Sequence, residues 1–348
     1  MPTTPVSVIT GFLGSGKTTL LSRLLRHPDM ARTAVVINEF GAVGLDHMLV
    51  EASDENIVQL NSGCLCCTIR GDLVLTLLDL LERRRRGDVT AFDRIVIETT
   101  GLADPAPILQ ALMTDNALAQ AIRVEGVVTT VDAVNGAATL DQYQESVKQA
   151  AVADQIIITK TDLVDTDSGD IRDRLAELNP MAPLLQAVQG DIAPNQLFNA
   201  GTYDLSAKSD EVRAWLNTNL PVHDHAHDVN RHSDGIRAHT VIRSEPIHAV
   251  ALTLFLEILA EHCGADLLRL KGLVKLIESP DQPAVIHGVQ NVFSPPVWLD
   301  RWPDESRDSK LVFITNDLPG VWFEDLLDAL NTEVAETVAR QENNKALA

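Results

Sequence analysis

Short runs of apolar, mostly β-branched residues alternate with helical patterns over the first two hundred residues of the chain. The apolar runs are typical of buried parallel strands and cover 6–10, 33–38, 94–99, 124–132 and 155–159. Helical patterns lie between them at 18–27, 71–86, 105–115 and 139–153. This alternation predicts an α/β fold with a doubly wound, mainly parallel sheet.

The pattern changes after residue 219. Residues 220–235 have no apolar period, which is typical of a linker or an exposed loop. This stretch contains four histidines: His223, His225, His227 and His232. Beyond it, strand-like runs at 238–243, 284–289 and 310–315 accompany helical runs at 246–262 and 320–335. We therefore predict one domain over 1–219, a linker over 220–237 and a smaller α+β domain over 238–348.

Composition narrows the class of protein. A net charge of −21 argues against a nucleic-acid surface. The run Arg83–Arg86 ends an amphipathic stretch, so we expect it to complement a helix C-terminus rather than to bind RNA. No segment reaches the roughly 18 apolar residues of a membrane span, and the N-terminus lacks the features of a secretory signal. The clustered cysteines favour a reducing cytosol, so we expect a cytoplasmic protein without membrane or nucleic-acid partners.

Residues 11–18, GFLGSGKT, fit the phosphate-binding pattern G-x-x-x-x-G-K-[ST] between a strand and a helix. In such a loop, backbone N–H groups surround the β-phosphate, the lysine reaches the β- and γ-phosphates, and the last hydroxyl binds Mg²⁺. We assign the last two roles to Lys17, expected to be exposed, and to Thr18. The nucleotide contacts predicted here are Gly11, Gly14, Ser15, Gly16, Lys17, Thr18 and Thr19.

Residues at the end of the 155–159 strand are similar to the N/T-K-x-D element that reads guanine: Thr159, Lys160 and Asp162. A carboxylate at Asp162 can accept hydrogen bonds from N1–H and the exocyclic amine of guanine, whereas adenine offers no such pair. Thr159 stands where Asn is commoner, and we expect this exchange to weaken the anchoring of the loop.

Two further strands end in acidic candidates. Glu98 ends the 94–99 strand, where a carboxylate would hold Mg²⁺ through water, and Gly101 would let a backbone amide approach the γ-phosphate. The alternative for Glu98 is a surface acid that closes the strand. In the segment 38–46, Glu39 and Asp46 are candidates for metal contact or for positioning water, with plain solvated loop charges as the alternative.

Three of the four cysteines, Cys64, Cys66 and Cys67, lie within four positions. This spacing suits neither a disulfide framework nor a core. A strand-like run and a turn precede them and a helix is expected from 68–72, so the thiols would lie before a helix N-terminus. Its positive end lowers the pKa of thiols and favours thiolates, which bind Zn²⁺ or Cu(I) better than Mg²⁺.

A closed structural zinc site has four protein ligands, and this cluster offers three at most. We therefore expect a site left incomplete so that the metal can be passed on. Its fourth ligand is left open among water, Glu39, His47, a linker histidine and a client residue. The remaining cysteine, Cys263, is expected to pack at a helix end.

Together these motifs resemble the CobW-type GTPases, which are P-loop metallochaperones, and in particular their YjiA-like bacterial members. The matching stretches are GFLGSGKTTLL, NEFGAVGLD, GCLCC, ETTGLADP, TKTD, LLRLKGLVKL and HGVQ. The resemblance implies GTP hydrolysis, binding of Zn²⁺ or a similar divalent ion at the cysteines, and delivery to a client protein. One position departs from the family, because Ala42 stands where many members have an acid.

The predicted function is therefore a GTP-hydrolysing carrier that delivers zinc to a client metalloprotein, with cobalt, nickel and iron as alternative cargoes. Two other classes are a P-loop kinase acting on a small molecule and a GTPase regulated by thiol oxidation at Cys66 or Cys67. The linker histidines suit either loose metal capture or a solvated linker. A homo-oligomer that depends on nucleotide or metal is a further expectation.

Overall fold

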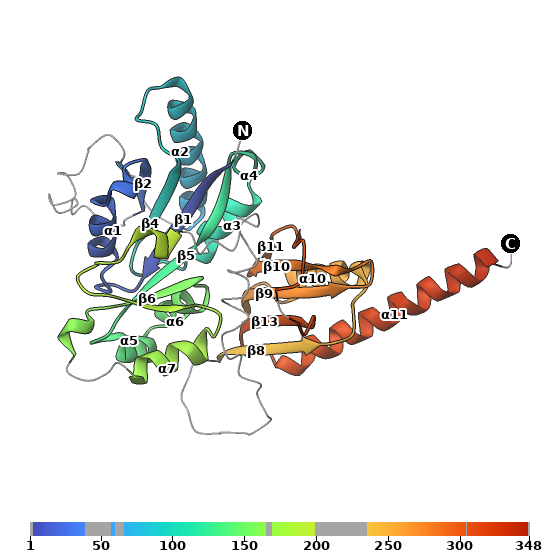
Figure 1. Ribbon diagram of the computed structural model, residues 1–348. Helices are drawn as coiled ribbons and strands as arrows, with labels where there is room; N and C mark the ends of the chain where they lie inside the picture. Colours follow the sequence, from blue (N-terminus) through green and yellow to red (C-terminus); the bar gives the residue numbers. More distant parts are fainter. Residues whose placement is uncertain are drawn as a thin grey trace. The chain divides into compact units, whose positions relative to one another are not determined.

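The computed structural model describes residues 3–38, 57–59, 66–164, 169–198, 235–303 and 305–346. The chain divides into two units, Met1–Asp204 and Leu205–Ala348 (Figure 1). The four histidines of the predicted linker lie outside the described residues, and the predicted domain limits at 219 and 238 stay predictions. No helix in the described part of the chain is both long enough and apolar enough to cross a membrane.

Within the described residues, the first unit contains a seven-stranded parallel sheet ordered β3-β2-β4-β1-β5-β6-β7. Its strands are β1 (Thr4–Gly11), β2 (Thr33–Asn38), β3 (Ile57–Gln59), β4 (Arg94–Thr99), β5 (Ile122–Asp132), β6 (Gln155–Thr159) and β7 (Leu184–Ala187). The predicted α/β fold is confirmed. Strands β2 and β3 lie on one side of β1 and strands β5 to β7 on the other. The direction in which successive strands are added to the sheet therefore reverses beside β1. Ligands of such sheets bind beyond the carboxyl ends of the strands at this point.

Helices surround this sheet (Figure 1). They are α1 (Lys17–Leu25), η1 (Pro28–Met30), α2 (Cys66–Arg86), α3 (Ala106–Thr114), α4 (Asn116–Ala121), α5 (Gly136–Gln142), α6 (Gln144–Ala151), η3 (Thr161–Leu163), α7 (Gly169–Leu178) and α8 (Pro194–Phe198). Leucines of α1 pack with Phe198 of α8 against buried side chains of six strands, including Ile9 and Val128. Helices α2, α3 and α4 pack against one another. The apolar positions of α1 therefore form a buried face, which holds the loop between β1 and α1 in place.

Two predicted helices differ from the structure. The pattern at 139–153 forms two helices, because Tyr143 between them has an extended backbone and its ring packs against Phe12, with the centroids 4.6 Å apart. Helix α2 begins at Cys66 instead of at 68–72. No Pro or Gly occurs at 66–70, so nothing there stops the helix from starting earlier. The thiols of Cys66 and Cys67 thus belong to the first turn of α2 and do not precede it.

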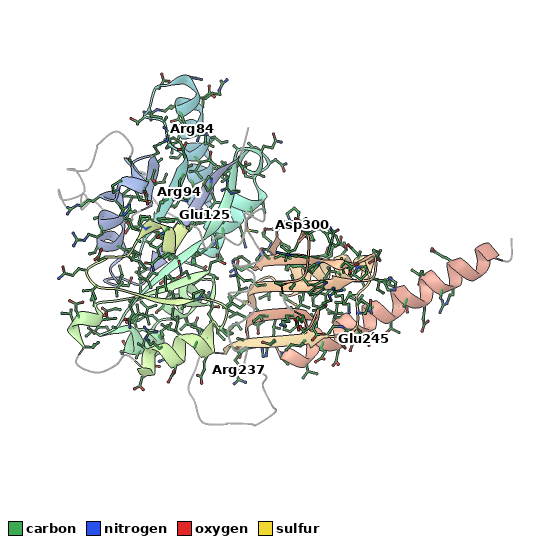
Figure 2. The ribbon with its side chains drawn as sticks, in the orientation of Figure 1. Arg84, Arg94, Glu125, Arg237, Glu245 and Asp300 are labelled. Atoms are coloured by element: carbon green, nitrogen blue, oxygen red, sulfur yellow. The ribbon has the colours of Figure 1, made fainter. Side chains whose placement is uncertain are left out.

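An ion pair and hydrogen bonds hold the amino ends of the central strands and the end of α2. Arg94 of β4 and Glu125 of β5 lie next to each other, with Nε and Oε2 3.2 Å apart (Figure 2). Glu125 also accepts a hydrogen bond from Ser7 of β1 at 2.6 Å. The arginine run does end α2, as predicted, and Arg84 donates to the carbonyl of Phe92 at 3.0 Å. These contacts are structural and lie away from the carboxyl edge of the sheet.

The second unit pairs an antiparallel sheet, ordered β11-β10-β9-β13-β8, with two helices that pack on each other. Its elements are β8 (Ile236–Arg243), α10 (Ala249–His262), β9 (Leu267–Leu276), β10 (Ser279–Val289), β11 (Val292–Phe293), β12 (Val297–Trp298), β13 (Ser309–Asn316) and α11 (Gly320–Ala346). Phe255, Phe313 and Phe323 are fully buried in its core. The predicted α+β architecture is confirmed.

In the second unit, too, several elements differ from the prediction. Strand β9 was not predicted, because a central strand covered on both faces has no alternation of polar and apolar positions. Strand β10 starts at Ser279, five residues before the predicted 284, and α11 continues to Ala346 instead of 335. Helix α10 starts at Ala249, after Pro246, and ends at His262, with Cys263 as its C-cap. Cys263 is buried as expected, and burial raises the pKa of its thiol.

Candidate functional site

The loop between β1 and α1 carries the phosphate-binding pattern. Gly14 and Gly16 have φ angles of 73° and 93°, in the region that side chains rarely adopt. Gly16 is also the N-cap of α1 and makes no side-chain cap, so the first N–H groups of the helix keep their capacity for an anion. The local conformation is therefore suited to a phosphate group.

Lys17 lies inside this loop. The expectation that it is exposed was wrong, since only 8% of the residue is accessible. Its ammonium donates hydrogen bonds to the carbonyls of Gly11 at 2.8 Å and Phe12 at 3.1 Å, because the loop curls back over the side chain. The positive charge is thus held in the concave side of the loop.

Thr18 and Glu98 form the metal-binding candidate. The hydroxyl of Thr18 donates to Oε1 of Glu98 at 2.7 Å, and Glu98 is 5% exposed. The alternative of a surface acid at Glu98 is therefore wrong. A hydroxyl beside a carboxylate supplies the hard oxygen ligands that Mg²⁺ prefers, so these residues fit that ion.

The loop after β4 is held against the phosphate-binding loop. A Cβ at Gly101 would lie 2.7 Å from Cα of Leu13, so only glycine allows this approach. From the other side, Nε2 of buried Gln149 donates to the carbonyls of Gly101 at 3.2 Å and Ala103 at 2.9 Å. The amide expected to meet the γ-phosphate is therefore held by contacts on both sides.

A Gly101→Ala variant tests this contact. We expect turnover of GTP to fall by about tenfold, because an overpacked backbone contact costs roughly 1–3 kcal/mol and must displace one loop. Steady-state phosphate release would measure the loss. Gly71→Ala is the matched control, since a Cβ there meets nothing within 4 Å. Equal turnover in both variants would contradict a role for the close approach of Gly101.

The TKTD element is tied to the phosphate-binding loop through Thr159. Its hydroxyl donates to the carbonyl of Ser15 at 2.7 Å. The Ser15 hydroxyl in turn shares a hydrogen bond with Thr130 of β5 at 2.6 Å. Threonine at position 159 therefore keeps an anchor to the loop, although its single proton makes fewer bonds than an Asn amide.

Lys160 and Asp162 follow Thr159. Lys160 has φ 57°, and its ammonium lies 2.6 Å from Oδ2 of Asp132, the last residue of β5. Burial raises the pKa of Asp132, but hydrogen bonds from Lys160, the Val134 N–H and Asn135 outweigh it and hold the pKa below its usual range. Asp162 lies in η3 and is exposed, so its carboxylate is accessible to a ligand.

Some predicted residues are not placed. Glu39, Ala42, Asp46, His47 and Cys64 lie outside the described residues, and the side chains of Cys66 and Cys67 are not described. Thr19 is exposed in the first turn of α1. The other residues predicted to contact nucleotide come together at the carboxyl edge of the sheet. Elsewhere in the described chain, no group of three His, Cys, Asp or Glu residues is arranged to hold a metal.

Sequence reasoning missed three polar residues of this edge: Thr130, Asp132 and Gln149. The first two end the predicted strand 124–132, and every polar residue at the carboxyl end of a parallel strand lies near the ligand crevice. That signal would have found them. Gln149 belongs to a helix and shows no comparable signal.

Comparisons with known proteins agree with this geometry. Residues 5–186 match the CobW/HypB/UreG nucleotide-binding domain, and residues 236–331 match the C-terminal domain of the cobalamin synthesis protein cobW. The zinc chaperone YjiA of Escherichia coli is 33% identical over 314 residues, which cover 90% of this chain and 94% of YjiA. The zinc-regulated GTPase metalloprotein activator 1 of Schizosaccharomyces pombe is 33% identical over 255 residues, or 68% of this chain and 61% of that protein.

A solved structure extends the similarity to the fold. The crystal structure of the Zn(II)-bound YjiA GTPase from E. coli aligns with a TM-score of 0.72 and 30% identity, and covers 95% of this chain and 99% of that one. The chain therefore belongs to the CobW family, with its nucleotide-binding domain followed by its C-terminal domain.

Proposed function

We propose that the protein is a GTP-hydrolysing metallochaperone that binds zinc at Cys64, Cys66 and Cys67 and delivers it to a client metalloprotein in a reducing cytosol. The observation that carries the proposal is the arrangement at the carboxyl edge of the first sheet. There the Lys17 loop, the Thr18–Glu98 pair and the TKTD turn are joined by hydrogen bonds.

In the proposed reaction, water attacks the γ-phosphorus of GTP, the bond to the β-phosphate oxygen breaks, and GDP and phosphate leave. Lys17 turns its ammonium from the loop carbonyls to the β- and γ-phosphate oxygens. Thr18 would hold Mg²⁺ directly and Glu98 through water, and the bound ion would offset the charge of the phosphates. The Gly101 amide contacts the γ-phosphate, and Glu39 and Asp46 remain the candidates for positioning water or metal.

The position of the cysteines supports coupling to the nucleotide. They follow β3, which is parallel to β2, and β2 pairs with the Glu98 strand in the register Ile37↔Glu98. Strand β3 thus ends at the same edge of the sheet as the phosphate-binding loop, three strand spacings or roughly 14 Å from β1. Cys66 and Cys67 begin a 21-residue helix, whose positive end favours thiolates.

Zinc is the proposed cargo because thiolates prefer it to hard cations and because the relatives are named zinc chaperones. Binding of GTP would order the loops at the edge and change the geometry of the cysteines, and hydrolysis would relax them. The client completes or replaces the ligand set when it takes the metal. Cobalt, nickel and iron are tested as alternative cargoes by elemental analysis of the reduced, untagged protein with and without a GTP analogue.

An Asp162→Asn variant tests the nucleotide assignment. We expect GTP affinity to fall by about 1–3 kcal/mol, because the amide cannot accept both guanine N–H groups. The same amide can donate to the C2 carbonyl of xanthine, so affinity for XTP should rise. Titration of GTP, XTP and ATP measures both effects, with Asp79→Asn on the exposed face of α2 as control. An unchanged preference for GTP over ATP would show that Asp162 does not read the base.

Two measurements separate the proposal from the other classes of protein. Release of free phosphate, with no phosphorylated metabolite, excludes a small-molecule kinase. Zinc titration of reduced and oxidised protein separates a metal carrier from a redox sensor. A carrier binds zinc tightly when reduced and responds to nucleotide in that state, whereas a sensor changes its hydrolysis rate with oxidation in the absence of metal.

A further inference from the structure

We propose that Asp132 is a positioning residue for guanine recognition, which it serves by holding Lys160 and through it the turn that presents Asp162. The proposal rests on the proposed function, because it concerns the base-reading part of that same site. Asp132 is the last residue of β5 and is 7% exposed. Its Oδ2 lies 2.6 Å from the Lys160 ammonium.

Asp132 is held in place by its own strand end. Its Oδ1 accepts hydrogen bonds from the backbone N–H of Val134 at 2.8 Å and of Asn135 at 3.4 Å. The side-chain amide of Asn135 donates to Oδ2 at 3.2 Å. The carboxylate is therefore oriented before Lys160 reaches it, and it can act as a fixed counter-charge for the lysine.

Lys160 occupies a backbone conformation that needs such support. Its φ of 57° is in the left-handed region, which non-glycine residues seldom adopt. The turn that it opens is closed by a hydrogen bond from Leu163 N–H to the Lys160 carbonyl at 3.1 Å. A second link joins the two strand ends, because Ala133 N–H donates to the Thr159 carbonyl at 2.9 Å.

Asp162 depends on this turn for its direction. It lies in the middle of η3 and is exposed, and no described residue donates a hydrogen bond to its carboxylate. The turn is held at its start by the Thr159 contact with Ser15 and on its flank by the ion pair of Lys160 with Asp132. The carboxylate of Asp132 thus positions Lys160, and through the turn it also positions Asp162 for contact with the base.

A double-mutant cycle tests the proposal with Asp132→Asn, Lys160→Met and the combined variant. Asparagine keeps an oxygen for the Val134 and Asn135 N–H groups but loses the charge that pairs with Lys160. Methionine keeps much of the lysine stem without the ammonium. The probes are GDP, ADP and pyrophosphate, each with Mg²⁺, titrated by calorimetry, and the thermal midpoint of every variant is recorded. Asp141→Asn is the control, since Asp141 also forms a 2.6 Å pair, with Arg174, between α5 and α7.

We expect Asp132→Asn to lower the affinity for GDP by about tenfold, because a charge-assisted contact is lost. The affinities for ADP and pyrophosphate should change by less than about twofold. The KM for GTP should rise while kcat stays near the wild-type value. The combined variant should bind GDP no more weakly than Lys160→Met alone, because both changes break one contact. The Asp141→Asn control should behave as wild type.

Three results would overturn the role of Asp132 while leaving guanine recognition intact. They are unchanged GDP affinity in Asp132→Asn, an equal loss for GDP and pyrophosphate, and additive losses in the combined variant. A wild-type protein that binds ADP as tightly as GDP would instead refute the proposed function and this proposal with it. The wild-type titration therefore distinguishes the two failures.

Discussion

Lys17→Ala is expected to lower GTP turnover by on the order of 10²- to 10³-fold, the usual loss when one preorganised donor to developing charge is removed. The reason is local, since the Lys17 ammonium is the cation that the structure holds inside the phosphate-binding loop. Phosphate release under saturating GTP measures kcat. A titration with GDP measures how much of the loss lies in binding.

The fold should survive this change with a moderate cost. Lys17 is buried and donates to the Gly11 and Phe12 carbonyls, so its removal leaves two acceptors to water and costs about 1 kcal/mol of unfolding free energy. Lys275→Ala is a matched control, because that ammonium also donates to a carbonyl, that of Ser244, in the second unit. If Lys17→Ala turned over GTP as fast as this control, the loop would have no part in hydrolysis.

Replacing Cys64, Cys66 and Cys67 together with serine is expected to remove tight zinc binding. A neutral hydroxyl is a far poorer zinc ligand than a thiolate. The loss should therefore exceed the roughly 10- to 100-fold that removal of an outer-shell partner costs. Basal hydrolysis should persist in part, because Lys17, Thr18 and Glu98 all remain in this variant. Competition with a chromophoric chelator measures the affinity.

The informative result of this variant is the loss of coupling. In wild type, zinc should change GTP affinity by the same factor by which GTP changes zinc affinity, typically about 5- to 150-fold, because linkage is reciprocal. In the triple variant, zinc should not change the affinity for GTP, and GTP should not change the affinity for zinc. Cys263→Ala serves as control, since that thiol is buried with a raised pKa and is expected to bind no zinc. Wild-type zinc affinity that is the same with GTP analogue, GDP and no nucleotide would contradict the gated carrier.

Much of the fold could be predicted because its signals are local. The limits predicted for β2, β4 and β6 coincide with the structure, since continuous β-branched runs between helical patterns are typical of buried parallel strands. Elements as short as β7 and α4 showed no such period. Strand β9 was missed because burial on both faces removes alternation, even with Arg269 and Lys271 inside it.

The site could be predicted in part for the same reason. The phosphate-binding loop and the TKTD element are contiguous stretches whose residues carry their chemistry in one local turn. The partners of these stretches come from elsewhere in the chain. Glu98 meets Thr18 across 80 residues and Thr159 meets Ser15 across 144. The sequence indicated the types of residue, and sheet order decided which of them meet.

The sequence by itself determined the parallel α/β architecture, the α+β character of the second unit and the phosphate-binding loop, because each depends on local period or on glycine backbone freedom. Only the tertiary structure decided that Lys17 is buried, that Tyr143 divides a predicted helix by packing on Phe12, and that Asp132 pairs with Lys160. The Tyr143 and Asp132 contacts join side chains from segments that the fold brings together, whereas Lys17 is buried because its own loop curls back over it. Their contact energies override local preference, and no pattern along the chain records them.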